Sequence, residues 1–253
     1  MDRVGMKSVN NFGSIIQVVR YKNASDVDIY FPQYDWTYYN ARYDYFSSGC
    51  IKCPYEPRVF CVGFIGEGKY NFKEYKHIYK VWGSMLERCY SKDYQLKRPT
   101  YINCLVCDEW HNFQNFAQWY EENYYEVNEE EMHLDKDILF KGNKIYSPET
   151  CIFVPNNINM LFTKSNKSRG TYPIGVTIDN KINKFRARCS IFDKEIRKYK
   201  RISLGYYSSV IEAFNCYKDF KEQHIKNVAD DYKDYIQLKL YNAMYNYNVD
   251  IDY

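Results

Sequence analysis

The sequence predicts an α+β protein, and three patterns along the chain indicate this class. Residues 12–70 hold short β-branched and aromatic runs between turn signals. Residues 76–88 carry apolar side chains at helical spacing, and residues 171–222 hold three strand-like runs followed by a capped helix. A chain of 253 residues can form one large domain or two to three small ones. We therefore expect domains at 1–70, 71–165 and 166–253.

The strand-like runs of the first domain cover residues 14–21, 27–31, 46–55 and 59–65, and Gly66–Glu67–Gly68 closes the last one. Short strands at this density predict a small twisted β-barrel. In the second domain, one helical stripe joins Ile78, Val81, Trp82, Met85 and Leu86. A second set of aromatic residues recurs every three or four positions and predicts a core stripe rather than a cofactor site: Trp110, Phe113, Phe116 and Trp119.

Residues 132–155 combine acidic, turn-forming and helix-starting signals. Asp135 and Asp137 stand in a strand-like run, and a Lys–Gly–Asn–Lys turn follows at 141–144. Tyr146–Ser147–Pro148–Glu149 is a helix-starting signal, and the apolar residues 152–154 follow it. This order predicts a strand, a turn, a second strand and a capped helix, which is how a small ββα metal site is built.

At these positions the sequence resembles the HNH endonuclease superfamily, in its phage and homing-type branch. The likeness rests on motifs in the family's order over about seventy residues: Trp82–Tyr90 with Met85 and Arg88, Val106–Trp110, 134–138 (Leu-Asp-Lys-Asp-Ile) and 142–151 (Gly-Asn-Lys-Ile-Tyr-Ser-Pro-Glu-Thr-Cys). The resemblance implies a phage-encoded protein of the host cytoplasm. It also implies an HNH-like ββα core with flanking helices that hydrolyses DNA phosphodiesters with Mg²⁺ or Mn²⁺.

The family's site residues carry over with two departures. Asp135 matches the first metal ligand and Asn143 the structural turn residue, but Lys136 stands at the position of the base histidine and Thr150 at that of the helix asparagine. A lysine acts as a base near neutral pH only if burial lowers its pKa by several units. His133 and Asp137 lie two residues to either side of Asp135 and are candidates for the base and the second ligand. The alternatives are a bystander histidine, and aspartates that only pair with Lys141, Lys144 or nearby arginines.

The third domain resembles the Apetala-type (ethylene-response-factor) DNA-binding domain. The matching residues are Gly175–Val176, Phe185 and Ala187, Leu204, Gly205 and Tyr207, and Glu212, Ala213 and Tyr217. The resemblance implies a three-stranded antiparallel sheet that enters the major groove of double-stranded DNA, with a helix behind it. Residues 162–201 carry twelve lysines and arginines against three acids. The candidate DNA-binding residues are Lys184, Arg186, Arg188, Arg197, Lys198, Lys200 and Arg201, and the alternative is a solvated strand face.

Cysteine usage leaves two interpretations. The chain has nine cysteines, and Cys89, Cys104, Cys107 and Cys151 together could form a structural Zn²⁺ site that braces the nuclease core. The other interpretation is buried free thiols, kept reduced in a cytosol.

Composition limits the partners. No apolar run is long enough for a membrane span, and we expect neither a signal peptide nor membrane contact. Residues 108–131 carry eight acids and no lysine or arginine, so they are expected to meet a basic surface or to form a solvated face. Two functions remain: a metal-dependent DNA endonuclease, or a catalytically inactive HNH scaffold that binds DNA or a host or phage protein, for example to inhibit a host defence enzyme.

Overall fold

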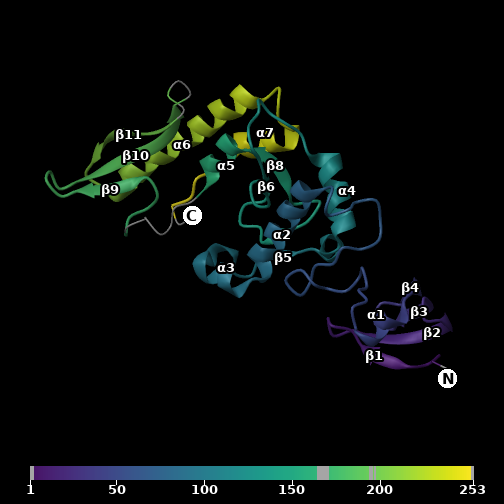
Figure 1. The fold of residues 1–253 in the computed structure, drawn as a ribbon. Helices are drawn as coiled ribbons and strands as arrows, with labels where there is room; N and C mark the ends of the chain where they lie inside the picture. Colours follow the sequence, from purple (N-terminus) through teal and green to yellow (C-terminus); the bar gives the residue numbers. More distant parts are fainter. Residues whose placement is uncertain (1–2, 164–170, 194–195, 197, 252–253) are drawn as a thin grey trace. The chain divides into compact units, whose positions relative to one another are not determined.

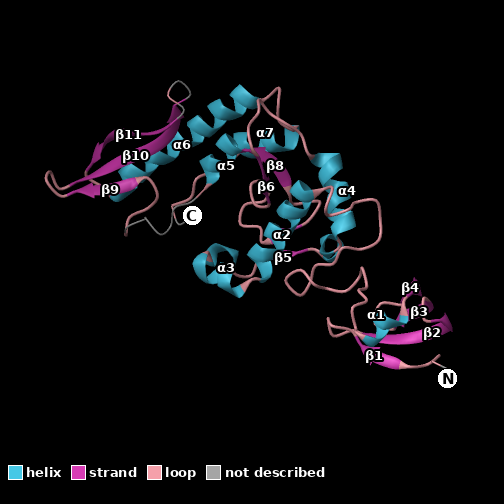
Figure 2. Ribbon diagram, in the orientation of Figure 1, coloured by secondary structure: helices cyan, strands magenta, loops and turns pink. Residues whose placement is uncertain are grey.

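A computed structural model describes residues 3–163, 171–193, 196 and 198–251 of the chain. It separates into two compact units, which are described one at a time: residues 1–123 with 144–149, and residues 124–143 with 150–253. Both units contain helices and strands, and the larger sheets are antiparallel and built from consecutive strands, so the predicted α+β class is confirmed (Figures 1 and 2). The expected domain limits near residues 70 and 165 stay a prediction.

The first unit begins with an antiparallel sheet in the order β1-β2-β3-β4, formed by Lys7–Val9, Ile15–Asn23, Asp26–Phe31 and Trp36–Ala41. Apolar side chains of β2 and β3 alternate toward a core with α1 (Tyr43–Ser47), in a cluster that includes Ile16, Val18, Ile29 and Phe46. The prediction of a closed barrel was wrong. Within the described residues, β1 and β4 each have one neighbour, and the sheet stays open.

Two of the expected N-terminal strands are absent from the described structure, for local reasons. The run at 46–55 begins inside α1, and Gly49 then has a φ of +69° in the turn that ends this helix. The run at 59–65 forms only an isolated bridge between Val59 and Gly63. Phe60 and Cys61 between them both have positive φ, so the chain reverses there instead of extending.

The central helices of the first unit follow the sequence prediction. The expected helix at 76–88 is α2 (Lys76–Tyr90), and its apolar stripe is buried. Trp82 donates a hydrogen bond of 2.7 Å from Nε1 to the carbonyl oxygen of Trp110, so the two predicted aromatic stripes form one core. The other elements are α3 (Lys92–Lys97), η1 (Pro99–Tyr101), β5 (Leu105–Val106), η2 (Asp108–His111), α4 (Phe113–Asn123) and β7 (Ile145–Tyr146), which pairs with β5.

The second unit contains the strand that carries the acidic residues. β6 (Met132–Asp135) pairs antiparallel with β8 (Ile152–Pro155), and α5 (Asn156–Phe162) follows directly. The prediction that a helix starts at 146–149 and includes Ile152–Val154 was wrong. These apolar residues pair with β6 as a buried strand, and the helix begins only after Pro155.

The C-terminal sheet and its helix match the prediction closely. β9 (Val176–Asp179), β10 (Lys184–Asp193) and β11 (Lys198–Tyr207) form an antiparallel sheet in the order β11-β10-β9, and α6 (Val210–Tyr232) packs against one face (Figure 1). The Oγ atom of Ser209 accepts a hydrogen bond of 3.2 Å from the backbone N–H of Ile211, which caps the helix as expected. Helix α6 ends at Tyr232, and α7 (Leu238–Tyr245) is a separate helix.

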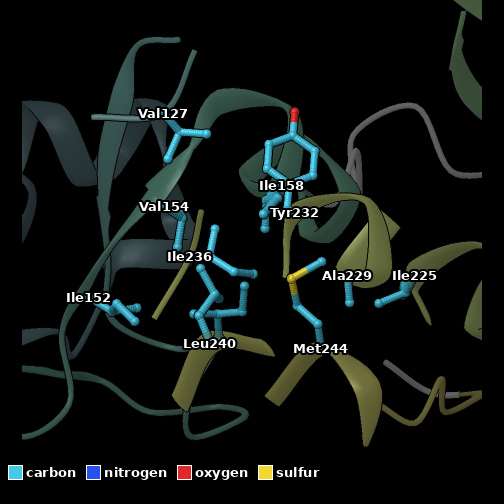
Figure 3. Close-up of a cluster of buried hydrophobic side chains, with 11 residues drawn as sticks. Val127, Ile152, Val154, Ile158, Ile225, Ala229, Tyr232, Ile236, Leu240 and Met244 are labelled. Carbon is cyan, nitrogen blue, oxygen red and sulfur yellow. The ribbon is translucent and has the colours of Figure 1, made fainter. Parts of the chain in front are cut away.

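Helix α6 contributes to two hydrophobic clusters. The sheet cluster joins its first half to the sheet: Val176, Ala187, Cys189, Ala213, Phe214, Tyr217 and Val249. The hairpin cluster joins its second half to β8, α5 and α7: Val127, Ile138, Ile152, Val154, Ile158, Ile225, Ala229, Tyr232, Ile236, Leu240 and Met244 (Figure 3). One helix therefore supports both the β6–β8 pair, called here the acidic hairpin, and the sheet of β9, β10 and β11, called here the basic sheet.

In the described part of the chain, no helix combines the length and the apolar character that crossing a membrane requires.

Candidate nucleic-acid interface

The face of the C-terminal sheet that points away from α6 gathers arginines from two strands. Along β10, Phe185, Ala187, Cys189 and Ile191 belong to the sheet cluster or pack against it, so the alternate residues occupy the opposite face. Those residues are Lys184, Arg186, Arg188, Ser190 and Phe192. Register places Arg201 of β11 opposite Ser190, which puts it on the same face next to Arg188.

The three arginines of this face, Arg186, Arg188 and Arg201, are called here the arginine face. Burial lowers the pKa of the Arg188 guanidinium, and the positive charges of Arg201 and Arg186 lower this pKa further. Among the residues that the structure describes, none of the three forms an ion pair with a carboxylate. Like charges held together without a counter-charge create a positive potential that an anion relieves.

Local contacts hold one of these guanidinium groups in place. The Nε atom of Arg186 donates a hydrogen bond of 3.0 Å to Oγ of Ser203, and its guanidinium carbon lies 5.5 Å from the ring centre of Tyr206. Tyr206 is opposite Arg186 across the strand pair. A pre-positioned arginine loses less side-chain entropy when it binds a phosphate or a guanine edge.

Not every predicted basic residue lies on this face. Lys198 and Lys200 are exposed, but they alternate with Arg201 along β11 and therefore point to the other side of the sheet. Lys184 lies on the arginine face opposite Asp179. Arg197 lies outside the described residues.

Sequence reasoning missed the contributions of Ser203 and Tyr206. The register of β11 shifts at the bulge between Ala187 and Arg188, where Gly205 has a φ of +144°. Because a bulge changes which residues share a face, alternation counted along the sequence could not place Tyr206 beside Arg186. The isolated glycine inside the predicted strand was the available signal.

The acidic turn after β6 is built from the predicted metal ligands, held by local hydrogen bonds. Oδ1 of Asp135 accepts hydrogen bonds from the backbone N–H groups of Asp137 at 2.9 Å and Ile138 at 2.7 Å. Burial raises the pKa of the Asp135 carboxyl to about 6, with a further contribution from the negative charge of Asp137. The Asp135 carboxyl therefore shapes the turn, and its negative charge is disfavoured there.

Lys136 and Asn143 hold the two ends of the following loop together. Nζ of Lys136 donates a hydrogen bond of 2.9 Å to the carbonyl oxygen of Asn143, and Nδ2 of Asn143 donates one of 2.6 Å to the carbonyl oxygen of Lys136. Lys136 is only 7% exposed, and its ammonium lies 3.3 Å from Oδ2 of Asp137. A buried ammonium beside the two carboxylates neutralises part of the charge that a divalent cation would need.

The remaining predicted residues of this site lie on or beside the same hairpin. His133 is on β6 opposite Val154, and its Nε2 atom is buried without a hydrogen-bond partner among the described residues. Thr150 lies in the turn that precedes β8 and is half-buried. Lys141, an alternative partner for the aspartates, is instead bound to Asp250 and to the carbonyl oxygen of Asn248.

A preformed site for a divalent metal ion is absent from the described residues. Within the described ranges, no group of three or more histidine, cysteine, aspartate or glutamate side chains is arranged to hold one. The same finding applies to the predicted zinc ligands, because no three cysteines gather among the residues that the structure describes. Mg²⁺ and Mn²⁺ binding remain predictions from the resemblance, and Zn²⁺ binding remains a prediction from the cysteine pattern.

The acids of the stretch 108–131 are divided between the two units of the chain. Glu121 lies 3.5 Å from Nζ of Lys69, and Asp108 lies 3.7 Å from Nδ1 of His111. Glu130 accepts a hydrogen bond from the hydroxyl group of Tyr232. Several of these acids therefore have partners within the chain.

Comparisons with protein-family models, with curated proteins and with solved structures gave no match to this chain.

Proposed function

We propose that this chain binds double-stranded DNA through the arginine face of its C-terminal sheet. The observation that carries the proposal is the group of Arg186, Arg188 and Arg201, which share one face without a carboxylate partner in the described residues. Polar and aromatic side chains surround them, which suits contacts to phosphates, sugars and base edges. The surrounding segment is strongly basic, which favours association with a polyanion.

The packing of the opposite face of the sheet supports the assignment of DNA binding to the arginine face. Helix α6 packs against that face and buries Ala187 and Cys189, so at the centre of the sheet the face with the arginines is the one left open to a DNA duplex. The sheet has three strands, and the side chains on its arginine face form a row that suits the major groove. The helix then acts as a rigid support for the binding strands.

The test compares two variants that each remove two positive charges. Arg188→Gln/Arg201→Gln changes the arginine face, and Lys198→Gln/Lys200→Gln changes the opposite side of β11. Binding of a fluorescent DNA duplex is measured by anisotropy between about 50 and 200 mM salt. We expect the arginine variant to lose on the order of tenfold or more in affinity and about two units of salt slope, because each phosphate contact contributes about one unit.

The lysine variant is expected to change affinity by a smaller factor. Equal losses in the two variants would show that net charge alone drives binding and would contradict the assignment to one face. Unchanged binding in the arginine variant would contradict it as well. Both variants change exposed or partly exposed side chains, so circular dichroism should show an unaltered fold.

The second candidate is a metal-dependent DNA endonuclease. It is favoured by the Asp135 and Asp137 carboxylates, which are close enough for one to raise the pKa of the other. The same DNA is incubated with Mg²⁺ or Mn²⁺, with EDTA, and with an Asp135→Ala/Asp137→Ala variant. Nicking that needs the metal and disappears in the variant would establish the nuclease. Binding without cleavage under every condition would leave a DNA-binding scaffold.

A further inference from the structure

A hollow of about 610 Å³ opens on the N-terminal sheet, in the first unit of the chain. Its walls carry four aromatic side chains, from the end of β3 and from β4: Tyr30, Trp36, Tyr38 and Tyr39. Tyr38 and Tyr39 are 39% and 68% exposed, so their rings are available to a ligand. Exposed aromatic rings grouped around a hollow are a common feature of recognition sites.

Two carboxylates complete this aromatic pocket, and a tyrosine hydroxyl group holds each of them. Tyr30 donates a hydrogen bond of 2.9 Å to Oδ1 of Asp35, and Tyr55 donates one of 3.0 Å to Oε2 of Glu67. Among the residues that the structure describes, no lysine or arginine lines the pocket. Within the described structure, neither Asp35 nor Glu67 forms an ion pair, so both charges face the hollow uncompensated.

The pocket lies along a free strand edge. β4 pairs only with β3, so the backbone groups of its other edge have no strand partner among the described residues. Such an edge can accept an extended segment of another protein, and pockets beside it then select alternate side chains of that segment.

We propose that this pocket binds the positively charged side chain of an extended basic segment in a partner protein. The ammonium or guanidinium group would lie against the faces of the tyrosine and tryptophan rings, where the ring quadrupole attracts cations. Asp35 and Glu67 supply the opposite charge, and the β4 edge supplies backbone hydrogen bonds. The same carboxylates repel phosphates, so this surface is distinct in its chemistry from the proposed DNA-binding face.

The experiment uses the full chain and matched synthetic peptides. One peptide has the sequence acetyl-Thr-Val-Arg-Val-Thr-amide, and the second replaces its arginine with citrulline, which keeps the shape and removes the charge. A third arm uses spermidine as a small free cation. Binding is measured by isothermal titration calorimetry and by the change in Trp36 fluorescence, with Trp36→Phe as the reference for the signal.

We expect the arginine peptide to bind on the order of tenfold more tightly than the citrulline peptide. The Asp35→Asn/Glu67→Gln variant is expected to lose this preference. The control variant Glu74→Gln/Asp93→Asn removes two exposed acids elsewhere in the same unit and should keep it. DNA binding should be unchanged in both variants, which separates this test from that of the proposed function.

Equal binding of the two peptides would overturn the proposal, and so would a preference that survives in Asp35→Asn/Glu67→Gln. Binding of spermidine as tight as that of the arginine peptide would overturn the assignment to a protein segment, because the strand edge would then contribute nothing.

Discussion

At the scale of single residues, the carboxyl group of Asp135 links the acidic turn to pH. Its Oδ1 atom accepts two backbone hydrogen bonds, while burial and Asp137 raise its pKa to about 6. In an unfolded chain this carboxyl would have its ordinary pKa of 3.8. The unfolded state therefore releases its proton at a lower pH than the folded state does, and ionisation weakens folding.

The resulting prediction concerns the pH dependence of stability. Below about pH 4 the group is protonated in both states and its full contribution is present; as pH rises through about 6 that contribution is lost. The rise in the pKa of Asp135 from 3.8 to about 6 corresponds to a loss of about 3 kcal/mol in the free energy of unfolding. Asp135→Asn keeps an oxygen acceptor and cannot ionise, so we expect it to be more stable than wild type by about 1–3 kcal/mol at pH 7 and equally stable near pH 4. Urea unfolding at the two pH values measures this difference.

Asp137→Asn is the control, because it removes the neighbouring negative charge and leaves the Asp135 carboxyl in place. We expect it to move the loss of stability to a lower pH. Parallel pH profiles for wild type and Asp135→Asn would show that the carboxyl is not perturbed in the folded protein.

Residue types alone did not reveal this role. The sequence identified Asp135, Asp137 and Lys136 as residues of the candidate metal site. It could not show that Lys136 is buried and donates a hydrogen bond to the carbonyl oxygen of Asn143. That bond spans the loop between them and depends on how the loop closes. Similarly, the charge count located the basic sheet, while the bulge at Gly205 decided which side chains accompany Arg186.

At the scale of elements, the C-terminal sheet and α6 fit together through one glycine. Gly175 precedes β9 with a φ of +80°, and a Cβ atom placed there would lie 2.2 Å from ring atoms of Tyr217 on α6. Its carbonyl oxygen accepts a hydrogen bond of 2.8 Å from the backbone N–H of Arg188. This close approach lets the helix pack directly under the strand that carries the arginines.

Gly175→Ala is expected to destabilise the protein by about 3 kcal/mol or more, since it combines a strained backbone with a clash in the core. Gly142→Ala is the matched control, because Gly142 also has a positive φ of +81° but has open space around it. That control should cost only about 1 kcal/mol. Thermal or urea unfolding of the two variants measures the difference, and equal losses would show that the Tyr217 ring moves aside.

The elements that sequence predicted well are those fixed by local signals. Ser209 at the start of α6 and the alternation along β10 depend on neighbours within a few residues. The run Ile152–Val154 had no such signal, because a short apolar segment suits a helix or a strand equally. Its pairing with β6 decided the outcome, and that partner is separated from it by a whole loop.

At the scale of the whole molecule, α6 joins the sheet cluster and the hairpin cluster in the second unit. The helix has 23 residues, so it is about 34 Å long. Phe214 near its start belongs to the sheet cluster. Ile225 further along belongs to the hairpin cluster, which Figure 3 shows. A rigid helix shared by two cores should make them unfold together, so the acidic hairpin and the basic sheet form one cooperative part.

Ile225→Ala tests this coupling. It removes a fully buried side chain from the hairpin cluster and should destabilise that cluster by about 2–5 kcal/mol. If the two cores unfold as one, the free energy that protects the β10 amides from hydrogen exchange should fall by the same amount, although Ile225 is not part of the sheet cluster. Ile16→Ala creates a similar cavity in the N-terminal sheet of the first unit and should leave the β10 amides unchanged. Unchanged protection of β10 in Ile225→Ala would show instead that α6 unfolds from one end, and that the basic sheet is held by the sheet cluster alone.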